Sequence, residues 1–447
     1  MNTEISANMR SDDAASAHQF RLTRLAVYVL TLVLCVPSDL FAKVMPGHRQ
    51  FLLPAAVALL LLVWLVADRG RLRAFTGLMS VLWAALALFL LWVVAASVLH
   101  PNVRESMILV GAYLVRVVML FVLVQILSGD WELLIRTQRL LVVGLGLLGL
   151  LMVTGLLDQF GGQVLATDVG GLHINRATAG LGDPNLTALI FNIGVALALG
   201  WLVTASSPRR RLFAGCIALL LVVGIGRTVS LGGVFGLVVV LWLTFWWMVP
   251  RAGYPLRWTL TLFIGGLMLA IIAVAGGIYL ERLQQQVVRT ERSAGNFGSQ
   301  RLNLALGGMR MAVANPLFGE GPVNVPAAMP VYVPFQSDNG KNGVHDGYIS
   351  VAAESGLPSW LLIMGAAAIA GTLFSRALRR ARYSDYRESY LIGGGIAVAL
   401  VASLVQTAAL DTQRQPFLWF VAALALSFAA HWRQPSSRLR TSPSGTL

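Results

Sequence analysis

Three residues that lie far apart in the sequence carry side chains suited to the chemistry of phosphates and alcohols. They are Arg227, Arg301 and His345. A guanidinium fork binds two phosphate oxygens at once, and a neutral imidazole with a pKa near ~6.5 accepts a proton at neutral pH. Two arginines beside a base therefore describe a site that displaces a pyrophosphate leaving group.

Two of these residues also have a plainer interpretation. Arg301 is equally compatible with a side chain that snorkels to lipid headgroups, and His345 with a solvated or structural histidine. Arg116 lies about nine residues into an apolar span, where a charge is costly and usually functional. A buried ion pair or backbone carbonyls would also satisfy it. These alternatives stay open at the level of sequence.

The elements that position these residues are membrane-spanning helices. The chain has 447 residues, of which 57% are hydrophobic and 12% charged, and a soluble domain carries roughly twice that charge. Apolar stretches of about 20 residues recur along the chain, each long enough to cross a bilayer. The sequence predicts an all-α polytopic membrane protein with about 12 transmembrane helices. The predicted spans are 25–44, 51–67, 77–98, 107–127, 139–157, 184–204, 212–225, 229–249, 257–280, 358–375, 389–410 and 416–432.

Arginine clusters orient these spans, because basic residues concentrate in cytoplasmic loops. The clusters are Arg69–Arg73, Arg209–Arg211 and Arg376–Arg382. With them inside, Arg227, Arg301 and His345 all map to the outer face. The net charge of +14 then reflects topology, and nucleic-acid binding is not expected. The predicted organisation is a cytoplasmic tail at 1–24, transmembrane helices 1–9 within 25–280, a periplasmic loop at 281–357, transmembrane helices 10–12 within 358–432, and a cytoplasmic tail at 433–447.

The large loop is predicted to contain short amphipathic helices. Ser299–Asn315 has apolar residues at helical spacing, and Asn315-Pro316 ends it. A second short helix follows from His345 to a stop at Gly356, and Pro358 opens the next span. A loop of this length is usually functional. A second outside segment, 158–183, is rich in glycine and contains His173 and Arg176.

Four short stretches, in this order and spacing, resemble a known group of membrane proteins. The chain is similar to the O-antigen ligase (WaaL-type) family, within the broader O-antigen ligase/polymerase membrane superfamily. The stretches are Gly182–Ala188, Gly226-Arg227, Arg301 with the Asn315–Pro322 turn, and His345–Pro358. Two positions depart from the family pattern: Asp346 stands where Asn is more usual, and a Gly precedes Arg227 in place of Ser or Thr.

The resemblance implies a glycosyltransferase of the bacterial inner membrane with a periplasmic active site. It implies transfer of O-antigen glycan from undecaprenyl pyrophosphate to a lipid A–core sugar hydroxyl in lipopolysaccharide biosynthesis. Arg227 and Arg301 would hold the pyrophosphate, with Arg116 a weaker candidate, and His345 would orient or deprotonate the acceptor. The partners would be these two substrates and membrane lipids.

The positions of the carboxylates indicate whether the reaction uses a metal ion. Metal-dependent sugar-nucleotide enzymes need clustered carboxylates to hold a divalent cation. Asp338, Asp346 and Glu354 are dispersed along the outer loop. The sequence therefore predicts a metal-independent, inverting reaction with no metal site and no cofactor.

Three other functions compete with the ligase. An O-antigen polymerase and a protein O-oligosaccharyltransferase would use the same donor with a different acceptor. A polyprenyl-glycan flippase or transporter belongs to another class, in which polar residues gather at the bilayer midplane. This chain concentrates its polar residues at one face, which favours an enzyme.

Overall fold

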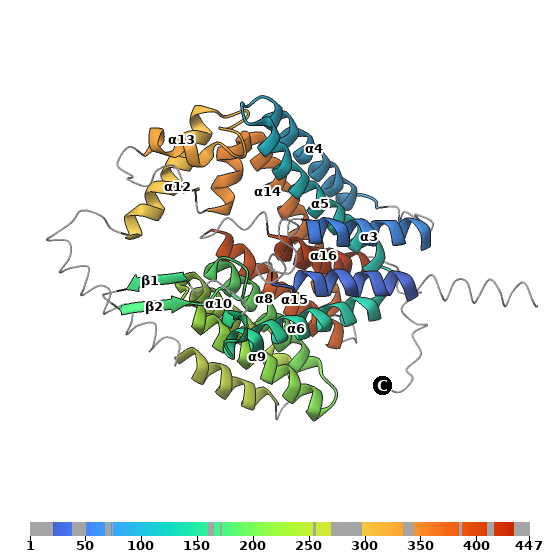
Figure 1. The fold of residues 1–447 in the computed structure, drawn as a ribbon. Coiled ribbons are helices and arrows are strands. Elements are labelled where there is room, and N and C mark those ends of the chain that lie inside the picture. The colour runs from blue at the N-terminus through green and yellow to red at the C-terminus, as the bar shows by residue number, and fades with distance from the viewer. Residues whose placement is uncertain are drawn as a thin grey trace, which may run out of the picture.

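The computed structural model is a bundle of helices with a smaller helical unit at one end (Figure 1). It describes residues 21–37, 51–67, 73, 75–159, 165–169, 172–253, 256–269, 297–333, 343–344, 346–383, 387–408 and 415–432, with the side chains of 158–175 and 297–301 left out.

Eight helical segments in the described residues are long and apolar enough to cross a membrane. They correspond to eight of the predicted spans. These segments are α4 (Leu78–Val98), α5 (Val103–Leu127), α6 (Trp131–Val153), α8 (Pro184–Thr204), α9 (Pro208–Thr228), α10 (Leu231–Trp247) with the short η2 (Val249–Arg251), α14 (Gly347–Arg382) and α15 (Arg387–Thr407).

The other four predicted spans contain shorter apolar helices in the part of the chain that is described. These helices are 21–34, α3 (Leu52–Ala67), Leu256–Leu269 and α16 (Pro416–His431). Residues 38–44 and 270–280 of two of these spans lie outside the described residues. The prediction of about 12 spans is thus confirmed for eight of them.

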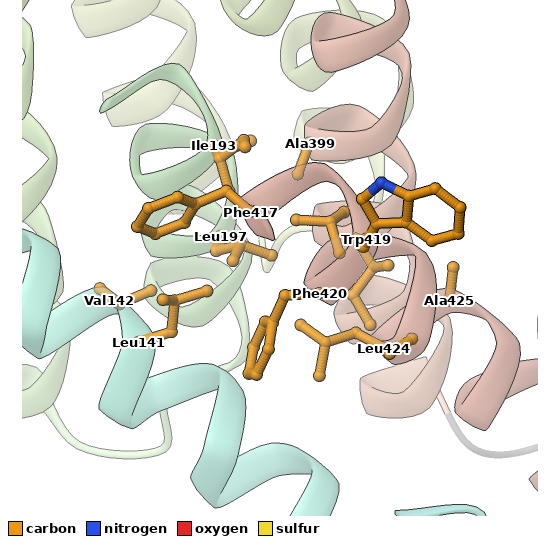
Figure 2. Close-up of a cluster of buried hydrophobic side chains, with 14 of the residues drawn as sticks. Leu141, Val142, Ile193, Leu197, Ala399, Phe417, Trp419, Phe420, Leu424 and Ala425 are labelled. Atoms are coloured by element: carbon orange, nitrogen blue, oxygen red, sulfur yellow. The ribbon is translucent and has the colours of Figure 1, made fainter. Parts of the chain in front are cut away.

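Helix α8 lies at the centre of the bundle and is buried along almost its whole length. Gly200 of α8 faces Gly395 of α15, and a Cβ at Gly200 would lie 3.1 Å from the Gly395 Cα. Small residues let two helix backbones approach closely in a membrane. Figure 2 shows the packed side chains around this centre, with Leu141 and Val142 from α6, Ile193 and Leu197 from α8, Ala399 from α15, and Phe417, Trp419, Phe420, Leu424 and Ala425 from α16.

The predicted helical fold class is confirmed, and one two-stranded antiparallel hairpin accompanies the helices in the described residues. Strand β1 (Leu165–Val169) pairs with β2 (Leu172–Arg176), and Val169 lies opposite Leu172. The two residues between the strands, Gly170 and Gly171, form a typical two-residue hairpin sequence. The glycine-rich segment 158–183 therefore contains regular structure, which the sequence analysis did not predict.

The smaller unit is built from α12 (Phe297–Ala314), α13 (Val325–Tyr332) and the first part of α14 (Figure 1). It has its own apolar core, which includes Leu304, Met311, Val325, Met329, Val333, Val344 and Ala353. The predicted helix at 299–315 is confirmed in position. Its predicted apolar stripe, however, points outward: the side chains of Leu302, Leu306, Met309 and Val313 are exposed.

Gly356 divides α14 into two helical segments. Its backbone has φ 83° and ψ 171°, a region that is accessible almost exclusively to glycine. The residue therefore ends the first segment, as the sequence predicted, and Pro358 lies in the first turn of the second. The break brings the turn after α12 against the backbone of α14.

Backbone hydrogen bonds connect these two turns directly. They run from Glu320 N to Ala353 O (2.8 Å), from Gly321 N to Glu354 O (3.0 Å) and from Leu357 N to Pro316 O (2.8 Å). Trp92 of α4 strengthens this connection, because its indole N–H lies 3.0 Å from Leu317 O and 3.1 Å from Ser355 O. The first segment of α14 is thus fixed to both α12 and the bundle.

We expect Gly356→Ala to destabilise the protein strongly. An alanine there is strained by about 1–3 kcal/mol, and its Cβ would overlap the carbonyl group of Leu317. The thermal unfolding midpoint of the purified protein in detergent should fall by several degrees. Gly365→Ala is the matched control on the same helix, because a Cβ at Gly365 meets no atom within 4 Å. Equal midpoints for the two variants would contradict the role given to Gly356.

Candidate active site

Arg227 lies in the last turn of α9 and is half-buried. Its Nη1 donates to the carbonyl oxygens of Met152 and Val153, the latter at 3.1 Å, and both belong to the last turn of α6. The carbonyl end of a helix is its negative pole, so this position stabilises a guanidinium cation. The backbone carbonyl of Arg227 also accepts a hydrogen bond from Ala177 N at 3.1 Å. Arg227 is thereby held in a fixed position.

A second arginine, which the sequence did not single out as a site residue, supports the turn after Arg227. Arg176, at the end of β2, donates from Nε to Thr228 O at 3.1 Å and from Nη2 to Asn185 Oδ1 at 3.3 Å. The same Asn185 oxygen accepts a hydrogen bond from Ser230 Oγ at 2.7 Å. Two positively charged side chains therefore lie on either side of the turn between α9 and α10.

The Gly182–Asn185 stretch explains how Asn185 reaches this turn. Asp183 caps the start of α8 and accepts a hydrogen bond from Asn185 N at 2.7 Å. Pro184 occupies the first helical position, where its missing N–H costs nothing. The side chain of Asn185 is thus placed in the first turn of α8, beside Arg176 and Ser230.

Two buried amides fix the start of α10. Asn192 Nδ2 donates to Gly233 O and Gln406 Nε2 to Gly232 O, each at 2.9 Å. Ser230 caps the same helix by accepting a hydrogen bond from Gly233 N at 3.0 Å. Because α9 and α10 are joined only by Val229 and Ser230, fixing α10 also fixes the position of Arg227.

His345 lies outside the described residues, but the residues on both sides of it are placed. Asp346 caps α14, and its Oδ1 accepts hydrogen bonds from Tyr348 N at 2.9 Å and Ile349 N at 3.0 Å. Val344 is buried against α12, where its side chain packs onto Gly308. His345 therefore follows a buried residue, Val344, and precedes Asp346, the residue that caps the start of α14.

Arg301 belongs to α12, although its side chain is not among those described. It lies seven residues before Gly308, the residue against which Val344 packs. Seven residues of helix span about 10 Å. The structure thus places the Arg301 backbone within two helical turns of the segment that carries His345.

The last turn of α15 connects the two halves of the site. Tyr348 donates from its hydroxyl to Leu404 O at 2.7 Å. Gln406, two residues later, donates to Gly232 O as described above. The turn therefore joins the segment that carries the predicted base to the segment that carries the predicted pyrophosphate arginine.

Arg116 lies near the middle of α5 and is half-buried. Its Nη1 donates to the carbonyl of Ala112, one turn earlier in the same helix. This contact matches the alternative in which backbone carbonyls satisfy the charge.

Residues 216–364 match the family model described as O-antigen ligase. The chain carries an O-antigen ligase domain. This domain begins within α9 and ends within α14, so it contains Arg227, Arg301 and His345. The family indicates a membrane glycosyltransferase of the ligase/polymerase type that acts on lipid-linked glycans. A comparison with curated proteins found no match.

Sequence reasoning about the O-antigen ligase domain missed part of what surrounds it. Arg176 and Asn192 lie before residue 216 and hydrogen-bond to the backbone of Thr228 and Gly233 within the domain. The hairpin signal at Gly170-Gly171 was the available clue, because a hairpin ending at Arg176 directs that side chain to a defined place. Within the described residues, His, Cys, Asp and Glu side chains form no group of three or more that could hold a metal ion.

Proposed function

We propose that the protein is a metal-independent, inverting glycosyltransferase of lipopolysaccharide biosynthesis. It moves O-antigen glycan from undecaprenyl pyrophosphate to a lipid A–core sugar hydroxyl at the periplasmic face of the inner membrane. The observation that carries this proposal is the last turn of α15, which contacts both Tyr348 and Gly232. This turn joins the segment next to His345, the proposed base, to the segment next to Arg227, whose guanidinium group is held in place.

In the proposed reaction the acceptor oxygen attacks the anomeric carbon of the donor sugar from the side opposite the pyrophosphate. The bond between that carbon and the pyrophosphate oxygen breaks as the new glycosidic bond forms, so the configuration inverts. His345 accepts the proton of the hydroxyl. Arg227 and Arg301 bind the pyrophosphate and stabilise the negative charge that it gains.

An apolar cavity beside the His345 segment supports a lipid-linked donor. It has a volume of about 170 Å³ and extends from Gly347 and Tyr348 along α14 to Ala370 and Gly371. Its remaining walls come from α4, α5, α15 and α16. Burial of a CH₂ group in such a place is worth about 0.8 kcal/mol. In our proposal the cavity holds part of the undecaprenyl chain while the pyrophosphate lies at the outer end.

Disruption of the gene in its native host tests this assignment. We expect lipid A–core to lose its long glycan while lipid-linked glycan of full length accumulates, as measured by gel analysis of both pools. The intact gene supplied on a plasmid should restore the wild-type pattern. Lipid-linked glycan shortened to single repeats would identify a polymerase instead. Unchanged lipopolysaccharide with loss of glycosylated protein would identify a protein O-oligosaccharyltransferase.

A further inference from the structure

A second cavity lies at the opposite end of α14 from the candidate active site. Its volume is about 460 Å³, and α10, η2 and the ends of α14 and α15 enclose it. The helical segment after Gly356 is 26 residues long, so about 40 Å of helix separates the two places. The pattern of basic residues predicts that this end faces the cytoplasm.

Three arginines and three tryptophans dominate the wall of this cavity. They are Arg251, Arg379, Arg382, Trp242, Trp246 and Trp247. Trp242 and Trp246 are 51% and 65% exposed, on a helix that is apolar throughout. Tryptophan is enriched where the hydrocarbon of a membrane meets the headgroups. The cavity therefore combines a positive lining with an aromatic rim at the membrane boundary.

On one side of the cavity, Arg251 is held in place by several contacts. Arg251 Nη1 donates to Trp247 O at 2.6 Å, and its guanidinium carbon lies 5.0 Å from the centre of the Tyr390 ring. Trp247 Nε1 donates to the Tyr390 hydroxyl, and Arg387 donates to Arg251 O. These contacts hold the cation in place before any ligand arrives.

The opposite side of the cavity presents two arginines from the end of α14. Arg379 and Arg382 are one turn apart and exposed. Within the described residues no hydrogen bond or ion pair is recorded for either guanidinium group. Glu388, a carboxylate at the start of α15, interacts with Arg139. Asp385 lies outside the described residues.

We propose that this cavity binds the headgroup of an anionic membrane phospholipid. Guanidinium forks match phosphate oxygens, and basic pockets between transmembrane helices at the cytoplasmic side bind such headgroups. The phosphodiester lies between Arg251 and the Arg379–Arg382 pair, and the acyl chains follow the exposed faces of Trp242 and Trp246. A free phosphate ion would make no contact with Trp242 and Trp246, whereas the acyl chains of a lipid would, so these side chains favour a lipid.

Native mass spectrometry of the purified full-length protein tests the proposal with phosphatidylglycerol as the probe. We expect Arg379→Ala and Arg382→Ala each to weaken phosphatidylglycerol binding about fivefold, the effect of one basic residue near an anionic surface. Arg376→Ala is the matched control: it removes an equally exposed arginine from the same helix, but Arg376 does not line the cavity. It should bind the lipid like the wild type.

Three results would overturn this site. One is an equal loss of binding in Arg376→Ala, which would show diffuse attraction to the basic face. Another is binding of phosphatidylcholine as tight as that of phosphatidylglycerol. The third is full displacement of the lipid by an equal concentration of inorganic phosphate, which would show a simple anion site. Because glycan transfer is not the readout, failure here leaves the proposed reaction untouched.

Discussion

His345→Ala should lower the rate of glycan transfer about 10²–10⁴-fold, the usual contribution of a positioned base, while donor binding survives. The hydroxyl that attacks the anomeric carbon must lose its proton, and His345 is the histidine within the loop that the sequence predicts to be periplasmic, 281–357. Arg227 and Arg301, the proposed pyrophosphate ligands, remain in this variant. The measurement is transfer by purified protein in nanodiscs, with donor affinity determined separately. His48→Ala, in a short loop predicted to lie outside, is the control.

His345→Gln separates two roles for the same residue. Glutamine can hydrogen-bond the acceptor hydroxyl but cannot take its proton. If His345 is the base, His345→Gln should be as inactive as His345→Ala. If Gln retains most of the activity, His345 only positions the acceptor. Loss of donor binding in the Ala variant would instead assign the histidine to the pyrophosphate site.

Arg227→Lys should reduce kcat/KM for transfer roughly 10²-fold, comparable to the loss of one charge-stabilising donor. Lysine keeps the positive charge but lacks the planar fork. It cannot contact the carbonyl groups of Met152 and Val153 and still present a second pair of donors to pyrophosphate. The measurement is steady-state kinetics with varied donor concentration, together with the unfolding midpoint to establish that the fold is intact.

Arg211→Lys provides a matched control on the same helix. Arg211 also donates to a backbone carbonyl, that of Ala205 at 2.9 Å, but in the first turn of α9, at the far end from Arg227. We expect this variant to keep wild-type kinetics. Wild-type activity in both Arg227→Ala and Arg301→Ala would eliminate the pyrophosphate interpretation. A large fall in the unfolding midpoint of Arg227→Lys would assign its effect to the contact with α6.

The parts of the fold that could be predicted were those governed by local chemistry. Long apolar runs predicted about 12 spans, and eight of these coincide with described helices that are long and apolar enough to cross a membrane. Gly356 and Pro358 predicted the break within α14. The orientation of α12 could not be predicted, because its contact face combines Leu304 and Met311 with Gly307 and Gly308, while Leu302, Leu306, Met309 and Val313 are exposed. The two glycines let the side chains of Val333 and Val344 approach the helix closely. The spacing of apolar residues does not predict such a contact, because glycine adds little to the hydrophobicity of a helix face.

In the candidate site, too, some features follow from the local sequence and others depend on long-range packing. Arg227 could be predicted because a guanidinium group suits phosphate oxygens and because the predicted topology maps it to the same face as Arg301 and His345. The contribution of Arg176 depends on a hydrogen bond to Thr228, 52 residues away, and no local pattern encodes such a contact. The connection through Leu404 and Gln406 depends equally on how α15 packs, which only the folded bundle determines.

The contact between the turn after α12 and the break in α14 has a consequence for evolution. Its hydrogen bonds join backbone atoms alone, so they constrain Gly319 and Gly356 but leave most neighbouring side chains free to change. Leu317, for example, is 57% exposed and contributes its carbonyl, not its side chain, to the contact with Trp92. Surface residues around this contact can therefore change in the course of evolution without disturbing the backbone contacts that hold the first segment of α14 against the turn after α12.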